Sequence, residues 1–337
     1  MNQQTIKGYD VIGDVHGHVH ALEGLLCQMG YSHEHGHWRH PERKAIFVGD
    51  LVDRGTHQIA TVQLARAMVD AGTALMVIGN HEYNAVAWAT PRPDFPGEFC
   101  RTHSDNKFKQ HRAFLEQVVE GSALHQEFLD WFCTLPLWLE VELGRQKLRV
   151  VHACWDDPSM DILRPLLKPD LSLTREAVEI TSIRDGAAYN ALEVVLKGPE
   201  IWLQGIAYLD HSGKARHNAR RRWWDAEALT LDAAALIPRD AVGPDGQPVP
   251  PLPHIEVEPM ASRSNDIPVV VGHYWESPDE LSVYSPLVTC VDHSLANKGP
   301  LVAYRWSGES RLIDANHVAY WVPHPNAEDV PDEGPDD

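Results

Sequence analysis

Three short segments place side chains that can bind metals or transfer protons directly after apolar runs. They are GDVHG at 13–17, GDLVDRG at 49–55 and GNHE at 79–82. Each begins with glycine, which permits a tight turn and a close backbone approach where side chains must converge. Carboxylates, imidazoles and an amide suit hard or borderline divalent cations and argue against copper or iron–sulfur chemistry. The segments therefore predict a divalent metal site.

The spacing of the acidic residues indicates more than one metal ion. Asp14 and His16 are two residues apart and can face one ion together. Asp50 follows the next strand-like run and can bridge two ions, while Asn80 adds a neutral oxygen. Two bridged metals lower the pKa of a shared water and hold both the entering and the leaving oxygen of a phosphoryl transfer.

The same segments contain a candidate proton donor. An alkoxide is a poor leaving group, so the reaction needs a protonated imidazole with a carboxylate beside it, and His81 with Asp53 can supply this pair. Arg54 offers a planar fork for two phosphate oxygens. A covalent mechanism has less support, because the chain has neither a phosphatase-like CxxxxxR loop nor a GxSxG elbow.

In this order and at these separations, the segments resemble metallophosphoesterases of the phosphoprotein phosphatase type. That group includes Ser/Thr protein phosphatases, the lambda phage phosphatase and bacterial symmetrical diadenosine tetraphosphate hydrolases. The clear match covers about 9–83, with shorter matches at VVHA (150–153) and VVGHY (270–274). The resemblance implies an α/β fold, the calcineurin-like metallophosphoesterase sandwich, with two mixed β-sheets flanked by helices and a helical insertion.

The resemblance also implies a role for individual residues. Two divalent ions would be bound by Asp14, His16 and Asp50 at the first site and by Asp50, Asn80, His152 and His273 at the second. Manganese is the favoured metal, with iron, zinc, cobalt and nickel as alternatives. A metal-bridging hydroxide would attack the phosphorus, His81 would be the general acid, oriented by Asp53, and Arg54 would bind phosphate oxygens. Ala153 and Cys154 stand where many relatives have two glycines, which leaves the local loop shape open.

A second phosphate-binding arginine is sought in the segment GKARHNARRRWWD at 213–225. Its arginines are Arg216, Arg220, Arg221 and Arg222, and they precede Trp223 and Trp224. In an acidic chain, such a cluster could bind phosphate and stack a base or an aryl group. We favour Arg216 and Arg221. The alternative is a solvated basic helix face that covers two core tryptophans.

Alternating strands and helices are predicted to position the three segments. Apolar runs end at Ile12 and cover 45–48 and 75–78, with helices expected over 18–29 and 58–69. This alternation predicts a parallel sheet, in which chemistry collects at the carboxyl ends of the strands.

The later part of the chain is predicted to add helices and a second sheet. The spacing of apolar residues over 106–133 predicts two amphipathic helices broken at Gly121 and Ser122. A hairpin is expected over 137–151 and a helix over 174–180. Short strands are expected at 269–271, 287–291 and 301–304, all in the second sheet. The predicted organisation is one domain over 1–325, with a helical insertion at about 84–134, a Pro-rich loop at about 237–268 and an acidic disordered tail at 326–337.

Other polar residues near these segments receive less specific interpretations. Asn106, Lys107 and His111 could line the pocket, but an ordinary surface helix is favoured. A cluster of histidines predicts an exposed hairpin without a dedicated metal; its members are His33, His35, His37 and His40. Asp292 follows a strand and could support the site from behind its ligands.

Composition limits the partners. The chain of 337 residues carries a formal net charge of −19, which disfavours nucleic acid and anionic membranes as primary partners. Five scattered cysteines without a CxxC spacing predict a reduced protein. No apolar stretch reaches the roughly 18 residues of a membrane span, and only Met1 to Gln4 precede the first strand-like run, so a cytoplasmic location is expected.

Three functions fit these observations. The leading hypothesis is a phosphomonoesterase that acts on small molecules or phosphoproteins. The second is a hydrolase of dinucleoside polyphosphates, which needs space for two nucleosides. The third is a catalytically silent metal-binding scaffold, which the complete set of ligands with His81 and Asp53 argues against.

Overall fold

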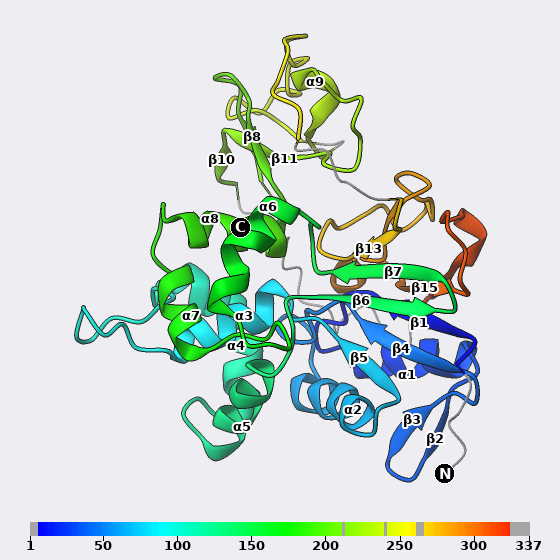
Figure 1. Cartoon of the computed structure of the whole chain (residues 1–337). Coiled ribbons are helices and arrows are strands. Elements are labelled where there is room, and N and C mark those ends of the chain that lie inside the picture. The colour runs from blue at the N-terminus through cyan, green and yellow to red at the C-terminus, as the bar shows by residue number, and fades with distance from the viewer. Residues whose placement is uncertain (1–5, 211–212, 239–240, 261–265, 324–337) are drawn as a thin grey trace.

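Two mixed β-sheets pack face to face at the centre of the molecule (Figure 1). The structure is a computed structural model and describes residues 6–210, 213–238, 241–260 and 266–323. The predicted α/β fold with two mixed sheets flanked by helices is confirmed. The predicted acidic tail at 326–337 lies outside the described residues, and the predicted domain boundaries remain predictions.

The first sheet contains the strands that precede the three sequence segments. Its order is β16 (His317–Tyr320), β15 (Leu301–Trp306), β1 (Gly8–Ile12), β4 (Arg43–Phe47) and β5 (Ala74–Met76). β1, β4 and β5 are parallel, whereas β15 pairs antiparallel with β1. The prediction that 301–304 belongs to the second sheet is therefore wrong. A short apolar run fixes that a strand forms, but its partner depends on which edge is free in the folded chain.

The second sheet has the order β14 (Val288–Cys290), β13 (Val269–Val271), β7 (Gln146–Val151) and β6 (Trp138–Leu143). β6 and β7 form the predicted antiparallel hairpin. β7, β13 and β14 are parallel. Both sheets thus contain three parallel strands, and the loops that follow those strands can meet at one end of the sandwich.

The core between the sheets is made of alternate residues of their strands. Val11 and Ile46 of the first sheet pack in one cluster with Val150 and Val270 of the second. Their neighbours Ile12 and Phe47 point to the opposite face, where they join a larger helical core. The apolar strands are buried on both faces, as the sequence runs indicate.

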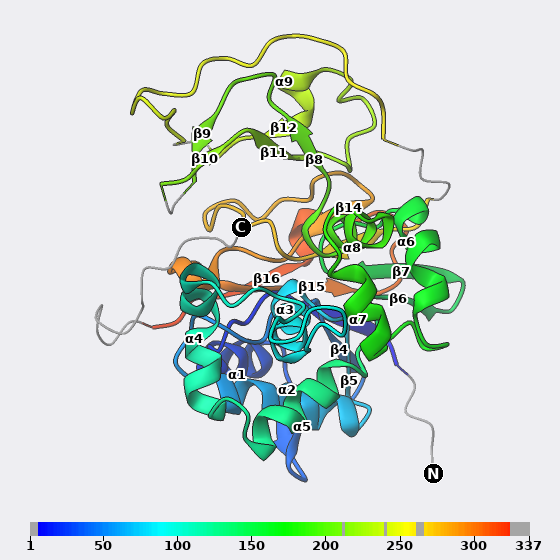
Figure 2. The same cartoon turned by 90° about the vertical axis from the view of Figure 1, so that its left-hand side faces the viewer.

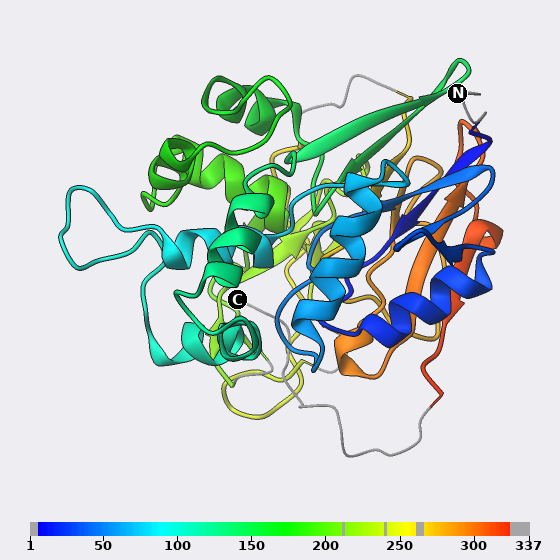
Figure 3. The same ribbon diagram turned by 90° about the horizontal axis from the view of Figure 1, so that it is seen from below.

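Helices α1 (Val19–Gln28) and α2 (Gln58–Asp70) cover the outer face of the first sheet (Figure 3). The two predicted amphipathic helices are confirmed as α4 (Asp105–Val118) and α5 (Ala123–Phe132). The break falls where predicted, because the hydroxyl of Ser122 accepts a hydrogen bond from the amide of His125 and begins α5.

Further helices lie on the same side of the sandwich as α4 and α5 (Figures 1 and 2). They are α3 (Asn80–Ala89), α6 (Asp157–Leu163), α7 (Arg175–Thr181) and α8 (Ala187–Lys197). α3 begins within the GNHE segment, so Asn80, His81 and Glu82 lie in its first turn. The first turn of a helix favours negative charge, and the buried Glu82 satisfies this preference.

A small subdomain from residue 200 to about 258 lies above the sandwich in Figures 1 and 2. Its strands are β8 (Glu200–Trp202), β9 (Tyr208–Leu209), β10 (Ala215–Arg216), β11 (Asn218–Arg221) and β12 (Ala235–Leu236), with helix α9 (Leu231–Ala234). It packs around its own apolar cluster of Leu203, Ala219, Leu231 and Ala235. The basic segment therefore lies partly on strands, and the alternative of a basic helix face is wrong.

The histidine-rich segment forms the predicted exposed hairpin, of β2 (Ser32–Glu34) and β3 (His37–Arg39). Among the helices of the described ranges, none combines the length and the apolar character needed to cross a lipid bilayer.

Candidate metal centre and active site

The polar side chains singled out in the sequence converge at the carboxyl ends of five parallel strands. These residues follow their strands closely: Asp14 after β1, Asp50 after β4, Asn80 after β5, His152 after β7 and His273 after β13. Both sheets therefore contribute to one site. In parallel sheets this edge is the usual place for ligand binding and catalysis.

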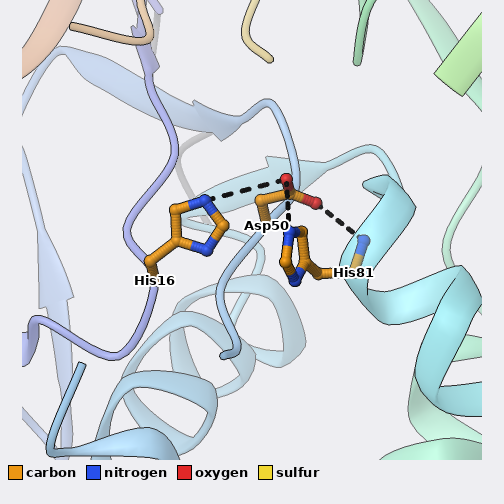
Figure 4. Close-up of side chains that lie close together, drawn as sticks. All are labelled: His16, Asp50 and His81. Carbon is orange, nitrogen blue, oxygen red and sulfur yellow. Dashed lines mark hydrogen bonds and ion pairs between the residues drawn. The ribbon is translucent and has the colours of Figure 1, made fainter. Parts of the chain in front are cut away.

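Asp50 lies at the centre of the site, where its Oδ2 atom faces three imidazoles. The Nε2 atoms of His16, His81 and His152 lie 3.9, 3.8 and 3.3 Å from it. Figure 4 shows Asp50 between His16 and His81, and the amide of His81 donates to Oδ1 at 2.9 Å. Two groups of side chains could each hold a metal ion, namely His16, Asp50 and His81, and Asp50, His152 and His273. Asp50 is common to both, as a bridging ligand must be.

Two glycines allow the backbone to approach the carboxylates. A Cβ atom at Gly79 would lie 2.1 Å from Oδ1 of Asp50, and one at Gly272 would lie 2.1 Å from Oδ1 of Asp14. Neither position can accept a side chain without moving a candidate ligand. Steric hindrance thus explains why glycine stands at these two positions.

Several residues of the site have left-handed backbone conformations that side chains other than glycine rarely adopt. The φ angles are 44° at His16, 54° at Asp50, 70° at Asp53, 71° at Arg54 and 73° at His273. Such conformations cost on the order of 1–3 kcal/mol each and cluster at functional sites. The fold holds these loops strained so that their side chains point inward.

Backbone carbonyls orient two of the candidate histidine ligands. Nδ1 of His16 donates to the carbonyl of Val52 at 2.9 Å, and Nδ1 of His152 donates to the carbonyl of Val48 at 2.8 Å. The opposite nitrogen of each ring therefore faces Asp50. Hydrogen bonds of this kind fix the ring and its tautomer for metal binding.

Asn80 joins the two histidines of the second candidate group. Its Oδ1 atom lies 2.9 Å from Nε2 of His152 and 3.0 Å from Nδ1 of His273. One amide oxygen, two imidazole nitrogens and the Asp50 carboxylate thus point at a common position. This is a mixed donor set that suits a borderline divalent cation.

The protonation of the site also fits a cation. Burial disfavours a charged His152, but the attraction and hydrogen bond from Asp50 outweigh it and raise the pKa of His152 to about 9. A cation held by Asp50, Asn80 and His152 would take the place of a proton on Nε2 of His152. Burial, followed by repulsion from Asp292, raises the pKa of Asp14, whose Oδ1 has no hydrogen-bond partner among the described residues. A buried carboxylate oxygen without a donor is what a metal ligand requires.

Glu82 supports the site from beneath Asp50. Its carboxylate accepts hydrogen bonds from the amides of Asp50, Leu51 and Gly79 at 2.8, 2.7 and 3.0 Å. It ties the β4 and β5 loops together without facing the candidate metal positions.

His81 and Asp53 form the predicted pair. Nδ1 of His81 lies 2.5 Å from Oδ2 of Asp53, so Nε2 of the ring faces Asp50. The other carboxylate oxygen of Asp53 lies 2.7 Å from Nδ1 of His111. The expectation that His111 belongs to an ordinary surface helix is therefore wrong. It shares the buried stripe of α4 with Phe114, Leu115 and Val118, and that helical spacing could have indicated its burial.

Arg54 is buried beside the same site. Its side chain is 6% exposed, and its guanidinium carbon lies 4.5 Å from the ring centroid of Trp275. Trp275 in turn donates its amide to Oδ2 of Asp292 at 3.0 Å. Asp292 thus positions the loop that follows His273 and lies close enough to Asp14 to raise its pKa. Sequence reasoning did not identify Trp275, and nothing in its local pattern marks it.

The basic cluster contributes its arginines unequally. Arg216 pairs with Asp210 at 2.8 Å, Arg220 pairs with Glu200 at 2.9 Å, and Arg221 donates to the carbonyl of Glu258. After burial, the positive charge of Arg220 is the largest cause that lowers the pKa of His273. Arg220 is thus electrostatically coupled to the candidate metal site, while the proposed substrate roles of Arg216 and Arg221 remain predictions.

Comparison with known proteins agrees with this geometry. Residues 9–174 match the family described as calcineurin-like phosphoesterase. This match assigns residues 9–174 to a calcineurin-like phosphoesterase domain.

Among characterised proteins, the chain is similar to asymmetrical bis(5'-nucleosyl)-tetraphosphatases named PrpE. It is 43% identical to the protein of Halalkalibacterium halodurans over 74 residues, which cover 22% of this chain and 30% of that protein. It is 31% identical to the protein of a Geobacillus species over 147 residues, which cover 43% of this chain and 56% of the relative. The chain thus spans less than two thirds of the length of both relatives.

Among solved structures, the chain is similar to a protein serine/threonine phosphatase of Saccharomyces cerevisiae with similarity to human phosphatase PP5. The identity is 17%, the alignment covers 99% of this chain and 84% of the other, and the TM-score is 0.47.

Proposed function

We propose that the chain is a dinuclear-metal-dependent phosphoesterase in which His81 protonates the leaving group. The single observation that carries this proposal is the placement of the His81 ring. Its Nδ1 is held by Asp53 at 2.5 Å, while its Nε2 faces Oδ2 of Asp50 at 3.8 Å. A general acid needs this arrangement, with one nitrogen fixed by a carboxylate and the other directed at the reacting group.

The donor set fits two divalent cations, of which manganese is our first choice. The ligands we propose are Asp14, His16 and Asp50 for one ion and Asp50, Asn80, His152 and His273 for the other. His81 lies in one group with His16 and Asp50, but we assign it as the proton donor because Asp53 holds its Nδ1. When bound, such a pair lowers the pKa of water and neutralises phosphate charge.

The remaining roles belong to side chains of this chain. Arg54 presents a guanidinium that is pre-oriented by Trp275 and can bind two phosphate oxygens. Asp53 holds His81 in the tautomer with hydrogen on Nδ1, so that Nε2 can carry the proton that is transferred. These groups act on one phosphoryl group. The simplest substrate that offers one is a phosphomonoester, in a small molecule or in a phosphoprotein.

A second candidate substrate is a dinucleoside polyphosphate, and a series of cations beside the site favours it. Burial, followed by the charges of Arg101, Arg184 and Lys197, lowers the pKa of Lys107 to about 8. Lys197 also acts on His273, together with Arg220. Positive charges from α4, α8 and β11 therefore act on the same region of an acidic chain, and a chain of phosphates would add negative charge there to that of Glu193 and Glu200, which pair with Lys197 and Arg220 at 2.9 Å. The PrpE relatives are named bis(5'-nucleosyl)-tetraphosphatases, and this name favours the same substrate class.

The proposed general acid is tested by the dependence of the rate on the leaving group. His81→Asn should reduce kcat/KM for an alkyl phosphate by about 10²–10⁴ and that for a nitrophenyl phosphate far less, because a stable aryloxide departs with little help. Asp53→Asn should show the same trend more mildly, and both variants should retain their metals. Equal losses for all leaving groups would remove His81 from this role.

The two substrate classes are separated by direct competition. Purified protein, stripped and reloaded with Mn, Co, Ni, Mg or Zn, would be given alkyl phosphates, a phosphopeptide and diadenosine tetraphosphate. We expect hydrolysis of the tetraphosphate to tolerate His81→Asn better than that of alkyl phosphates, because its leaving group is a phosphate with a pKa of about 6. A metal-replete protein inactive on all of these would support the silent scaffold instead.

A cytoplasmic location is part of the proposal. All five cysteines are free thiols, two of them buried. This fits a reducing compartment, where disulfides are rare.

A further inference from the structure

A single buried carboxylate is shared by two imidazoles. Oδ2 of Asp53 lies 2.5 Å from Nδ1 of His81, and Oδ1 lies 2.7 Å from Nδ1 of His111. Asp53 and His111 are each 2% exposed, and they stand 58 residues apart in the sequence. Each oxygen thus has its own histidine, and only one of the two histidines faces the metal centre.

The contact from His111 has a defined direction. Burial alone would raise the pKa of Asp53, but the charge and hydrogen bond of His111, followed by those of His81, lower it to about 2. A carboxylate oxygen accepts hydrogen bonds, so Nδ1 of His111, 2.7 Å from Oδ1 of Asp53, is the donor. Its Nε2 is buried and has no hydrogen-bond partner within the described ranges. The ring packs on Phe114 and Trp88 at centroid distances of 5.1 and 6.1 Å.

The hydrogen bond to Asp53 is the one polar contact of the His111 ring among the described residues. This ring is enclosed by aromatic side chains and offers a single donor, which points at Asp53. The terminal torsion of an aspartate side chain is broad, so the rotamer alone does not fix the plane of the carboxylate. A second hydrogen bond on the far oxygen does fix it.

We propose that His111 is a positioning residue for general-acid catalysis, which holds the Asp53 carboxylate in the plane that His81 requires. This inference rests on the proposed role of His81. Without the donor on His111, Asp53 can turn, and the bond to His81 loses its direction. The His81 ring would then point its Nε2 less often at the leaving oxygen.

Docking of α4 does not depend on this hydrogen bond. Gln117 accepts from the amide of Gln58 at 2.8 Å and donates to the carbonyl of Thr56 at 2.8 Å. Phe114, Leu115 and Val118 are buried against the rest of the core. The helix therefore has other anchors, and removal of the His111 donor can be tested in a folded protein.

The chain offers both a conservative variant and a matched control. In His111→Asn, the side-chain amide nitrogen can take the place of Nδ1 and keep a donor toward Asp53, whereas His111→Leu removes it. His125→Leu is the control, because His125 is 3% exposed and packs on the same Phe114 ring at 5.7 Å. Its Nδ1 instead accepts from the amide of Gly121 at 3.1 Å.

The measurement is kcat/KM against leaving-group pKa for the metal-loaded full chain. We expect His111→Leu to lose about 10–100-fold on alkyl phosphates, as is typical when a supporting hydrogen bond is removed, and to lose little on nitrophenyl phosphate. His111→Asn should recover most of the loss. His125→Leu should not change the slope of the plot. A loss for His111→Leu that is equal for all leaving groups, or matched by His125→Leu, would overturn the proposal.

Two further measurements separate this inference from the proposed function. In the His81→Asn background, His111→Leu should add no further loss, because both changes disable one unit; an additive loss would contradict the inference. Proton NMR of the zinc-loaded protein should show the hydrogen-bonded Nδ1 proton of His81 downfield in wild type and His111→Asn, and moved or broadened in His111→Leu. A protein that hydrolyses no phosphate ester but keeps this pattern would refute the proposed function alone, and an unchanged resonance in His111→Leu would refute the inference alone.

Discussion

Arg54 and Trp275 form a stacked pair at the edge of the metal centre, with 4.5 Å between the guanidinium carbon and the ring centroid. Arg54 follows β4 of the first sheet, and Trp275 follows β13 of the second. The pair therefore spans the two sheets. The stacking restricts the guanidinium plane, and a guanidinium held in one plane can bind an anion through its edge.

Replacement of Arg54 by lysine should lower kcat/KM for a phosphate ester, because a point charge cannot reproduce the planar fork. The lost transition-state stabilisation should be about 1.5–3 kcal/mol. Trp275→Leu should reduce the same transition-state stabilisation by about 0.5–2 kcal/mol, because the cation–π contact is lost. Metal content should stay the same in both variants. The control is Arg92→Lys, which alters a similar stacked pair with Phe95 at 4.4 Å. If Arg92→Lys has as large an effect as Arg54→Lys, the stacking has no specific role in the site.

Substitution of the bridging residue should affect both metals. Asp50 is common to the two candidate ligand groups, so Asp50→Asn should reduce occupancy at both. His16→Ala should reduce occupancy mainly at one. Asp53→Asn is the control, since its oxygens are occupied by His81 and His111. Elemental analysis that finds two full equivalents of metal in Asp50→Asn would contradict the bridge.

The arginines of the basic segment should differ in kinetics. All three arginines have a partner, namely Glu200 for Arg220, Asp210 for Arg216 and the carbonyl of Glu258 for Arg221, but the charge of Arg220 also influences His273. We expect Arg220→Ala to raise KM by roughly 10–100-fold, which corresponds to about 1.5–3 kcal/mol for a lost charge-assisted contact. Arg216→Ala and Arg221→Ala should have smaller effects, and the exposed Arg222 provides the control. Wild-type KM values in all of these variants would leave the cluster without a substrate role.

Lys107 should make stability depend on pH in a defined direction. Its pKa is lowered to about 8 from an ordinary value of 10.5, so the folded chain binds this proton less tightly than the unfolded chain. The unfavourable effect is complete below pH 8 and fades as the pH rises toward 10.5. Lys107→Met should therefore raise the urea midpoint at pH 7, and the difference from wild type should narrow at alkaline pH.

The same lysine tests the polyphosphate hypothesis. Inorganic tripolyphosphate should stabilise wild type more than Lys107→Met at pH 7, because it neutralises the repelling cations.

The pH series has its own contrary outcome. A Lys107→Met variant that is less stable than wild type by the same amount at every pH would show that the lysine stem, and not its charge, affects stability.

The sequence alone predicted that the proposed ligands converge, because those residues closely follow apolar strands. Asp14, Asp50 and Asn80 lie one or more residues beyond β1, β4 and β5. Parallel pairing then brings the three loops to one edge, whatever the details of packing. The positions of His152 and His273 after β7 and β13 follow the same logic.

Tertiary structure decided the contacts that join distant segments. The partner strand of β15 is β1, although its own residues fit either sheet. His111 contacts Asp53 only because α4 packs against α2. The charge of Arg220 affects His273 only because the small subdomain lies above the sandwich. Local periodicity specifies which residues are buried or follow a strand. It does not specify which side chain from another segment meets them, because that depends on the packing of whole elements.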